Sequence, residues 1–165
     1  MTGAWCEGPY VRTAPLAVEE KPQSGAMPRH IVWELTQDCN LACRHCRKVS
    51  YPALTGSVLS TEQILRIIDD IAGCCRPTFI FSGGEPLVRP DLWTIAAHAH
   101  RRGALVVLET NATLVTPEAA RRLKESGVVA VAVALDGATA ETHDEFWGIP
   151  GAWDQAWRGI ENLKE

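Results

Sequence analysis

The sequence lacks long apolar runs and a strong excess of either charge, and each absence excludes a class of protein. The net charge is -4 over 165 residues, which gives no electrostatic basis for binding nucleic acid or an anionic membrane surface. No stretch reaches the about 18 apolar residues of a membrane-spanning helix, and the N-terminus lacks the apolar core of a secretory signal. We therefore predict a cytoplasmic protein with neither a nucleic-acid nor a membrane partner.

Cysteine is the residue type whose distribution is most informative. Six cysteines are present, and without an export signal we expect reduced thiols, some of them binding metal, rather than a disulfide framework. Three of them, Cys39, Cys43 and Cys46, lie in the stretch TQDCNLACRHC with C-x3-C-x2-C spacing. This spacing predicts a metal site that lacks one protein ligand.

Two kinds of metal site are compatible with three cysteines, and they differ in what supplies the fourth ligand. Thiolates are soft ligands that favour iron–sulfur clusters, zinc or copper(I). An electron-transfer [4Fe–4S] site takes four cysteines, so three cysteines leave one iron open to another molecule. A zinc site would need a fourth protein ligand, for which the candidates are His45, Cys6, Cys74 and Cys75. Ligand preference favours the iron–sulfur cluster, and zinc stays the alternative.

Hydrophobic periodicity divides the chain into a leader and one α/β unit. Residues 1–28 are rich in proline, glycine and charge, which predicts a flexible leader. From 29 to 165, short apolar runs alternate with segments of helical periodicity. The predicted strands are 30–36, 78–86 with its terminal glycine turn, 104–111 and 128–137; the predicted helices are 60–74, 91–103, 116–127 and 139–165, the last interrupted around 147–153.

This alternation predicts parallel β-α-β units. Right-handed crossovers place the carboxyl end of every strand at one edge of the sheet, where ligands bind in such folds. Four strands are too few to close a barrel, so we expect an α/β fold with a partial barrel. The almost entirely apolar strand 128–137 is expected to be covered on both faces, with an outer edge that has no further strand to pair with.

The stretch SGGEP, residues 82–86, ends the second predicted strand. The simpler interpretation is a tight turn in which glycine supplies positive φ and proline fixes the exit. Two consecutive glycines also let a ligand approach the backbone, and Glu85 could accept hydrogen bonds from a ligand ammonium group. No Gly-Lys-Ser/Thr follows, which excludes a nucleotide P-loop.

Polar side chains also follow the next two predicted strands. Asn111 and Asp136 each either cap a turn or contact a ligand, and the sequence leaves both interpretations open. Trp147, Trp153 and Trp157 lie near helical spacing, which predicts packing rather than a stacking platform.

Together these motifs resemble the radical S-adenosylmethionine (AdoMet) superfamily. The matching segments are CNLACRHC (39–46), SGGEP (82–86), ETNATLV (109–115) and VALDGAT (133–139). The resemblance covers 29–165 and is closest to the branch whose members often carry a SPASM or twitch domain. Within that branch, HIVWELTQDCNLACRHCR and TAETHDEFWGIPGAW look most like enzymes of alternative haem and haem d1 biosynthesis, and peptide-modifying maturases share much of the pattern.

The resemblance implies that Cys39, Cys43 and Cys46 bind three irons of a [4Fe–4S] cluster and that AdoMet chelates the fourth. It implies further cofactor contacts from His45 near the adenine, Gly83, Gly84 and Glu85 at the methionine ammonium, Pro86 shaping the turn, and Asn111 and Asp136 near AdoMet or substrate. A flavodoxin- or ferredoxin-like one-electron reductant would feed the cluster. Reductive cleavage of AdoMet would then give a radical that abstracts hydrogen from a tetrapyrrole precursor or a peptide.

Three departures from the family pattern affect these expectations. TNA replaces the common TNG, so Ala112 would strain a turn that needs positive φ. HDEFWG replaces the common HDxxRG, so Trp147 removes an arginine that could pair with a carboxylate. About four of the usual six strands are present, so we expect the N-terminal part of the core domain, over 29–165. The alternative is a non-catalytic metal-binding domain that holds structural zinc or an inactive iron–sulfur remnant.

Overall fold

A four-stranded parallel sheet organises the chain in the computed structural model, which describes residues 27–46 and 58–164. The strands follow one another in the order β1-β2-β3-β4, and every neighbouring pair is parallel. They are β1 His30–Thr36, β2 Thr78–Gly83, β3 Leu105–Thr110 and β4 Val128–Val133. Apart from its last two positions, the predicted leader at 1–28 lies outside the described residues, as does Cys6, so its flexibility stays a prediction.

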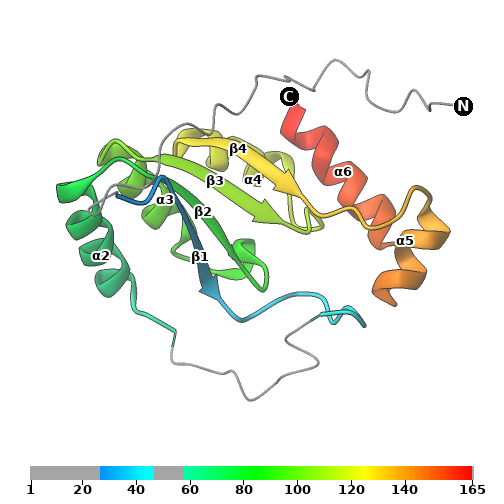
Figure 1. Ribbon diagram of the computed structural model, residues 1–165. Helices are drawn as coiled ribbons and strands as arrows, with labels where there is room; N and C mark the ends of the chain where they lie inside the picture. The colour runs from blue at the N-terminus through cyan, green and yellow to red at the C-terminus, as the bar shows by residue number, and fades with distance from the viewer. Residues whose placement is uncertain (1–26, 47–57, 165) are drawn as a thin grey trace, which may run out of the picture.

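The helices connect and follow these strands as the periodicity predicts. They are α2 Thr61–Cys74, the short 3-10 helix η2 Pro86–Val88, α3 Leu92–Arg101, α4 Pro117–Glu125, α5 Ala140–Trp147 and α6 Ala152–Lys164. Three of them, α2, α3 and α4, each lie between two strands in the chain, whereas α5 and α6 follow β4 (Figure 1). The predicted break in the last helix falls after α5, which Gly148 ends with a left-handed φ of 73°. None of the helices within the described ranges has the length and apolar content to cross a bilayer.

Local sequence signals explain where two of the helices begin. Ser60 Oγ accepts a hydrogen bond from Gln63 N at 3.2 Å, and Gln63 Oε1 accepts one from Ser60 N at 2.8 Å, which confirms a capping box at α2. At α4, Thr116 Oγ1 accepts a hydrogen bond from Ala119 N at 3.1 Å as a simple N-cap, and Pro117 occupies the first helical position. Such caps are worth about 1 kcal/mol each and fix which residues each helix turns toward the sheet.

The hydrophobic core lies between the sheet and these helices. Alternate residues of the two central strands are fully buried, namely Phe79, Phe81, Val106 and Leu108, and they belong to the same cluster as Ile64, Ile68, Leu92 and Ile95 of α2 and α3. Full burial of each large apolar side chain stabilises the fold by roughly 1.5–3 kcal/mol. Because the helices fix the direction of the central strands, they also fix where the loops at the carboxyl ends emerge.

The last strand differs from its prediction. We expected the apolar segment 128–137 to be covered on both faces, but β4 exposes Val129 at 55% and leaves Ala130 and Ala132 exposed as well. The expectation is wrong because the described part of the chain leaves a hollow beside β4, and Val129 and Ala130 are among the residues that line it. Among the described residues, β4 lies at the edge of the sheet with β3 as its neighbour.

Candidate functional site

The predicted site residues all lie at or just beyond the carboxyl ends of the four strands. The three-cysteine loop, which we define as residues 39–46, follows β1, and the turn at 83–86 follows β2. Asn111 comes directly after β3, and Asp136 comes shortly after β4. Because the strands are parallel, these four segments emerge at the same edge of the sheet (Figure 1).

Gly83 and Gly84 let the segment that precedes the three-cysteine loop pack directly on the turn after β2. Gly84 N donates to Thr36 O, and Glu85 N donates to Asp38 O, both at 2.8 Å. A Cβ atom on Gly84 would lie 2.2 Å from Asp38 O, and one on Gly83 would lie 2.2 Å from Thr36 O. The sequence suggested these glycines for ligand approach, and the structure adds that the protein's own backbone makes the close approach.

The Glu85 carboxylate joins the ends of β2 and β3. It is fully buried, and its Oε1 accepts hydrogen bonds from Leu87 N at 3.0 Å and Thr110 Oγ1 at 2.8 Å. Its Oε2 accepts one from Asn111 N at 2.9 Å. Burial raises the pKa of Glu85, and these three hydrogen bonds partly oppose that shift. The side chain thus positions two turns, and within 83–86 the residues that stay partly exposed are Gly83 and Gly84.

Arg89 is a buried positioning residue that the sequence reading missed. Its Nη1 donates to Leu35 O at 2.5 Å, near the end of β1, and its Nη2 donates to Leu59 O at 3.0 Å. Its Nε forms an ion pair with Asp91 at 2.7 Å. The one available signal was the Arg-x-Asp pair, which does not reveal that the guanidinium reaches back to β1.

The three cysteines are half-buried, and none of them forms a disulfide. Cys46 N donates to Cys43 O at 3.0 Å, which closes a turn within the loop. Burial, followed by repulsion from Cys39 and Cys46, raises the pKa of the Cys43 thiol to about 11. Thiolates that repel one another in this way need a cation to stay ionised together.

These thiols fit an iron–sulfur cluster better than one ion. Across 27–46 and 58–164, no three cysteine, histidine or acidic side chains are close enough together to hold a single metal ion. A [4Fe–4S] cluster places each cysteine on a different iron, so its ligands need not converge on one point. The soft donor set and the mutual repulsion of the thiols are therefore compatible with the predicted cluster.

His45 and Asp136 meet beside helix α5. The His45 ring stacks on Phe146 at 4.3 Å between centroids and 18° between planes, and His45 Nε2 lies 3.9 Å from Asp136 Oδ2. A hollow of about 580 Å³ adjoins them, lined by Arg44, His45, Thr142, Glu145 and Phe146. The stacking directs His45 toward α5, so its ring faces this hollow and Asp136.

Trp147 holds Asp136 in place. Its indole Nε1 donates to Asp136 Oδ2 at 2.8 Å, and its ring is 2% exposed and lies 4.1 Å from the His143 ring. The packing role predicted for Trp147 is confirmed, and the hydrogen bond adds a function that spacing did not reveal. Where the family pattern has arginine, this chain thus has a neutral donor that pairs with a carboxylate of its own.

Ala112 adopts the strained backbone expected from the TNA motif. Its φ is 61°, and it is the one non-glycine residue with positive φ in the described part of the chain. It is fully buried, and a Cβ atom on Gly159 of α6 would lie 2.1 Å from Ala112 O. The left-handed conformation costs about 1–2 kcal/mol, and the close packing of α6 helps to hold it.

His143 makes the stability of this region depend on pH. Its ring is fully buried, its Nδ1 accepts a hydrogen bond from Asp136 N at 3.2 Å, and its Nε2 has no hydrogen-bond partner among the described residues. Burial lowers the pKa of His143 below 6.5, and the Asp144 and Asp136 carboxylates only partly oppose this. The folded protein therefore keeps His143 neutral at a pH where the unfolded chain binds a proton.

We expect this group to contribute stability above pH 6.5 and to lose that contribution as the pH falls toward its lowered folded pKa. Urea unfolding of the wild type and His143→Gln at pH 7.5 and pH 5.5 checks this. Glutamine cannot titrate but can still accept from Asp136 N, so the wild type should lose more stability than the variant over this interval. Equal losses would contradict the prediction.

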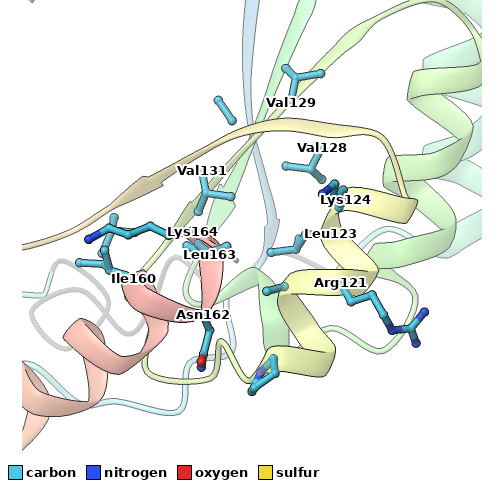
Figure 2. A pocket seen from close by; sticks show the side chains of 14 residues that line it. Arg121, Leu123, Lys124, Val128, Val129, Val131, Ile160, Asn162, Leu163 and Lys164 are labelled. Atoms are coloured by element: carbon cyan, nitrogen blue, oxygen red, sulfur yellow. The ribbon is translucent and has the colours of Figure 1, made fainter. Parts of the chain in front are cut away.

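A second hollow lies away from these residues, between β4, α4 and α6 (Figure 2). It has a volume of about 640 Å³, and Leu123, Val128, Val131, Ile160 and Leu163 are among its lining residues. No cysteine, histidine or acidic residue lines it, so it offers no group suited to bind iron. The candidate metal-ligating cysteines lie instead in the loop after β1, at the carboxyl edge of the sheet.

The fold and the site define a class: a partial (β/α) barrel with three cysteines in the loop after its first strand. The chain belongs to the radical SAM superfamily, because the sequence model of that family matches residues 33–165. The family's cofactors are a [4Fe–4S] cluster and AdoMet. The prediction of family, of fold and of cofactors is thus confirmed.

Similar proteins narrow the branch within the family. The chain is 47% identical over 138 residues to an AdoMet-dependent heme synthase of Methanosarcina barkeri, a match that covers 84% of this chain and 40% of that protein. It is 44% identical over 135 residues to an Fe-coproporphyrin III synthase of the same organism, covering 82% of this chain and 34% of that protein. The chain therefore spans well under half the length of these relatives.

A solved structure supports the fold. The structure of native anSMEcpe with bound AdoMet and the Cp18Cys peptide superposes with a TM-score of 0.67 at 20% identity. The match covers 83% of this chain and 40% of that one. At this identity the similarity shows the shared α/β architecture, and the chemistry must be argued from the residues of this chain.

Proposed function

We propose that residues 29–165 form the N-terminal part of the core domain of a radical SAM enzyme, with Cys39, Cys43 and Cys46 as ligands of a [4Fe–4S] cluster. The observation that carries the proposal is the three-cysteine loop after β1, together with the segment before it, in which Thr36 O and Asp38 O accept hydrogen bonds from Gly84 N and Glu85 N at 2.8 Å. Bound cluster and AdoMet would supply the reductive cleavage of AdoMet and the radical that abstracts hydrogen. The protein's residues would bind, orient and shield these groups.

The residues around the loop would hold AdoMet. The carbonyl oxygens of the partly exposed Gly83 and Gly84, in a turn that Glu85 holds and whose exit Pro86 sets, would receive the methionine ammonium, because that cation needs oxygen acceptors. His45, beside the hollow of about 580 Å³, would lie against the adenine. Asp136, whose carboxylate Trp147 holds from one side, would contact AdoMet or substrate at the same edge.

The substrate class is a tetrapyrrole precursor. The support is the similarity to proteins named AdoMet-dependent heme synthase and Fe-coproporphyrin III synthase, at 47% and 44% identity. A flavodoxin- or ferredoxin-like protein would supply the single electron. We place the protein in the cytoplasm, where thiols stay reduced, with no nucleic-acid or membrane partner.

Anaerobic reconstitution with iron and sulfide tests the proposed function. We expect one [4Fe–4S] cluster per chain, an EPR signal of the reduced cluster that changes when AdoMet is added, and release of 5′-deoxyadenosine after reduction. Addition of Fe-coproporphyrin III should increase that release if the substrate is a tetrapyrrole. Stimulation by a peptide alone would instead move the substrate class to the peptides.

Two outcomes would support the non-catalytic alternative. Zinc retained in place of iron, with no cluster signal, would identify a structural zinc domain. A cluster whose EPR signal does not change when AdoMet is added, with no 5′-deoxyadenosine formed, would identify an inactive iron–sulfur remnant. Each result contradicts the proposed activity at a different step.

A further inference from the structure

Asn111 is held more firmly than a residue that only caps a turn needs to be. Its backbone N donates to Glu85 Oε2 at 2.9 Å, and Glu85 is itself fixed by Thr110 Oγ1 and Leu87 N. The carboxylate that anchors Asn111 is fully buried. The position of Asn111 relative to the end of β2 is therefore determined by the core of the protein.

The orientation of the Asn111 side-chain amide is also determined. Its Oδ1 accepts hydrogen bonds from Thr113 N at 2.9 Å and Thr113 Oγ1 at 2.7 Å. A backbone N–H can only donate, so the oxygen must face Thr113 and the amide nitrogen must point the other way. The positive φ of Ala112 makes this tight turn possible.

The amide nitrogen points at the three-cysteine loop. Asn111 Nδ2 lies 3.9 Å from Cys39 Sγ and donates to Asn40 Oδ1 at 3.0 Å. Asn40 Nδ2 in turn donates to Thr113 Oγ1 at 2.8 Å, which closes a ring of side-chain hydrogen bonds between the loop and β3. A second donor, Leu41 N, lies 3.4 Å from the same sulfur.

We infer that Asn111 is a positioning residue that donates an N–H···S hydrogen bond to Cys39 and thereby raises the reduction potential of the cluster. The inference rests on the proposed function. Reduction adds negative charge that is shared with the ligating sulfurs, so a donor at a sulfur favours the reduced form. Asn111 would then act on AdoMet through the cluster, in addition to any contact at the edge of the sheet.

A redox titration of the reconstituted full chain, followed by EPR without AdoMet, tests the inference. Asn111→Ser removes the amide donor without adding charge and keeps a short acceptor for Thr113 N. We expect a more negative midpoint potential, corresponding to about a tenfold change in the ratio of oxidised to reduced cluster at a fixed potential, or 59 mV for one electron. The rate of iron loss to a chelator is a second readout and should rise.

Asn162→Ser is the matched control. It makes the same substitution at a side chain whose Nδ2 donates to Val115 O at 2.7 Å and not to the three-cysteine loop, so its midpoint potential should stay close to that of the wild type. A wild-type potential and a wild-type iron-loss rate in Asn111→Ser would overturn the inference while leaving the proposed function intact. Failure of the wild-type chain itself to assemble a cluster would overturn both.

Discussion

Cys43→Ala is expected to abolish binding of the [4Fe–4S] cluster and, with it, cleavage of AdoMet. Cys43 lies in the middle of the three-cysteine loop, and electrostatic interaction with Cys39 and Cys46 contributes to the raised pKa of its thiol. Two remaining thiolates leave two irons without a protein ligand. Loss of a residue that only hydrogen-bonds to a metal ligand typically costs about 10- to 100-fold in activity, so we expect loss of the ligand itself to reduce AdoMet cleavage by at least about 100-fold. Iron and sulfide content after anaerobic reconstitution, with 5′-deoxyadenosine release, measures the effect.

Cys74→Ala provides the control for this variant. It removes the same thiol from an exposed position at the end of α2. It should keep the wild-type cluster content and AdoMet cleavage. If the Cys43 variant bound as much iron as the Cys74 variant, with the same EPR signal, the ligand assignment would be wrong.

Gly84→Ala is expected to destabilise the fold and to displace the three-cysteine loop. The new Cβ would lie 2.2 Å from Asp38 O and 2.8 Å from Gln37 O, and both neighbours are backbone atoms. Relief requires the chain after β1 to move, which breaks the hydrogen bonds that Thr36 O and Asp38 O accept. We expect a loss of about 3 kcal/mol in the free energy of unfolding, or about 10 °C in melting temperature, and a lower cluster content.

Gly73→Ala is the matched control for this steric argument. Gly73 lies in α2, and a Cβ atom there would have nothing within 4 Å. The same substitution should therefore be neutral or stabilise the protein by up to about 1 kcal/mol, because alanine favours the helix. Thermal unfolding of the apo-proteins compares the two, and equal melting temperatures would refute the close packing at Gly84.

The elements and the location of the site could be predicted because their causes are local. The apolar residues of Thr61–Cys74 recur at helical spacing, and the capping box at Ser60 lies within four residues. Alternation of strands and helices then requires parallel strands, and parallel strands place their carboxyl ends at one edge. No contact between distant residues had to be known for this step.

The roles of individual side chains could not be predicted in the same way. Glu85 was expected to face a ligand ammonium, yet its hydrogen-bond partners Thr110 and Asn111 are 25 and 26 positions away in the chain. Arg89 reaches back 54 positions to Leu35 O. Whether a polar group near a turn faces a ligand or the protein depends on such partners, which spacing does not reveal.

The burial of apolar residues in the last strand, β4, could not be predicted from the sequence either. The apolar composition of Val128–Val133 shows that both faces of the strand could be buried, but it does not show which segments would pack on them. Val129 is 55% exposed, and it lines the hollow between β4, α4 and α6. Composition therefore predicts what a strand could bury, and the arrangement of its neighbours decides what it does bury.

The sequence by itself determined the α/β fold, the family, the three cysteines and the edge of the sheet where they lie, because each follows from periodicity or from a short contiguous motif. Only the tertiary structure decided that Gly84 receives the backbone after β1, that Trp147 pairs with Asp136, and that Asn111 points its amide at Cys39. The physical reason is that these contacts join the ends of different strands. Their geometry exists only after the helices have packed on the sheet and set the distances between those ends.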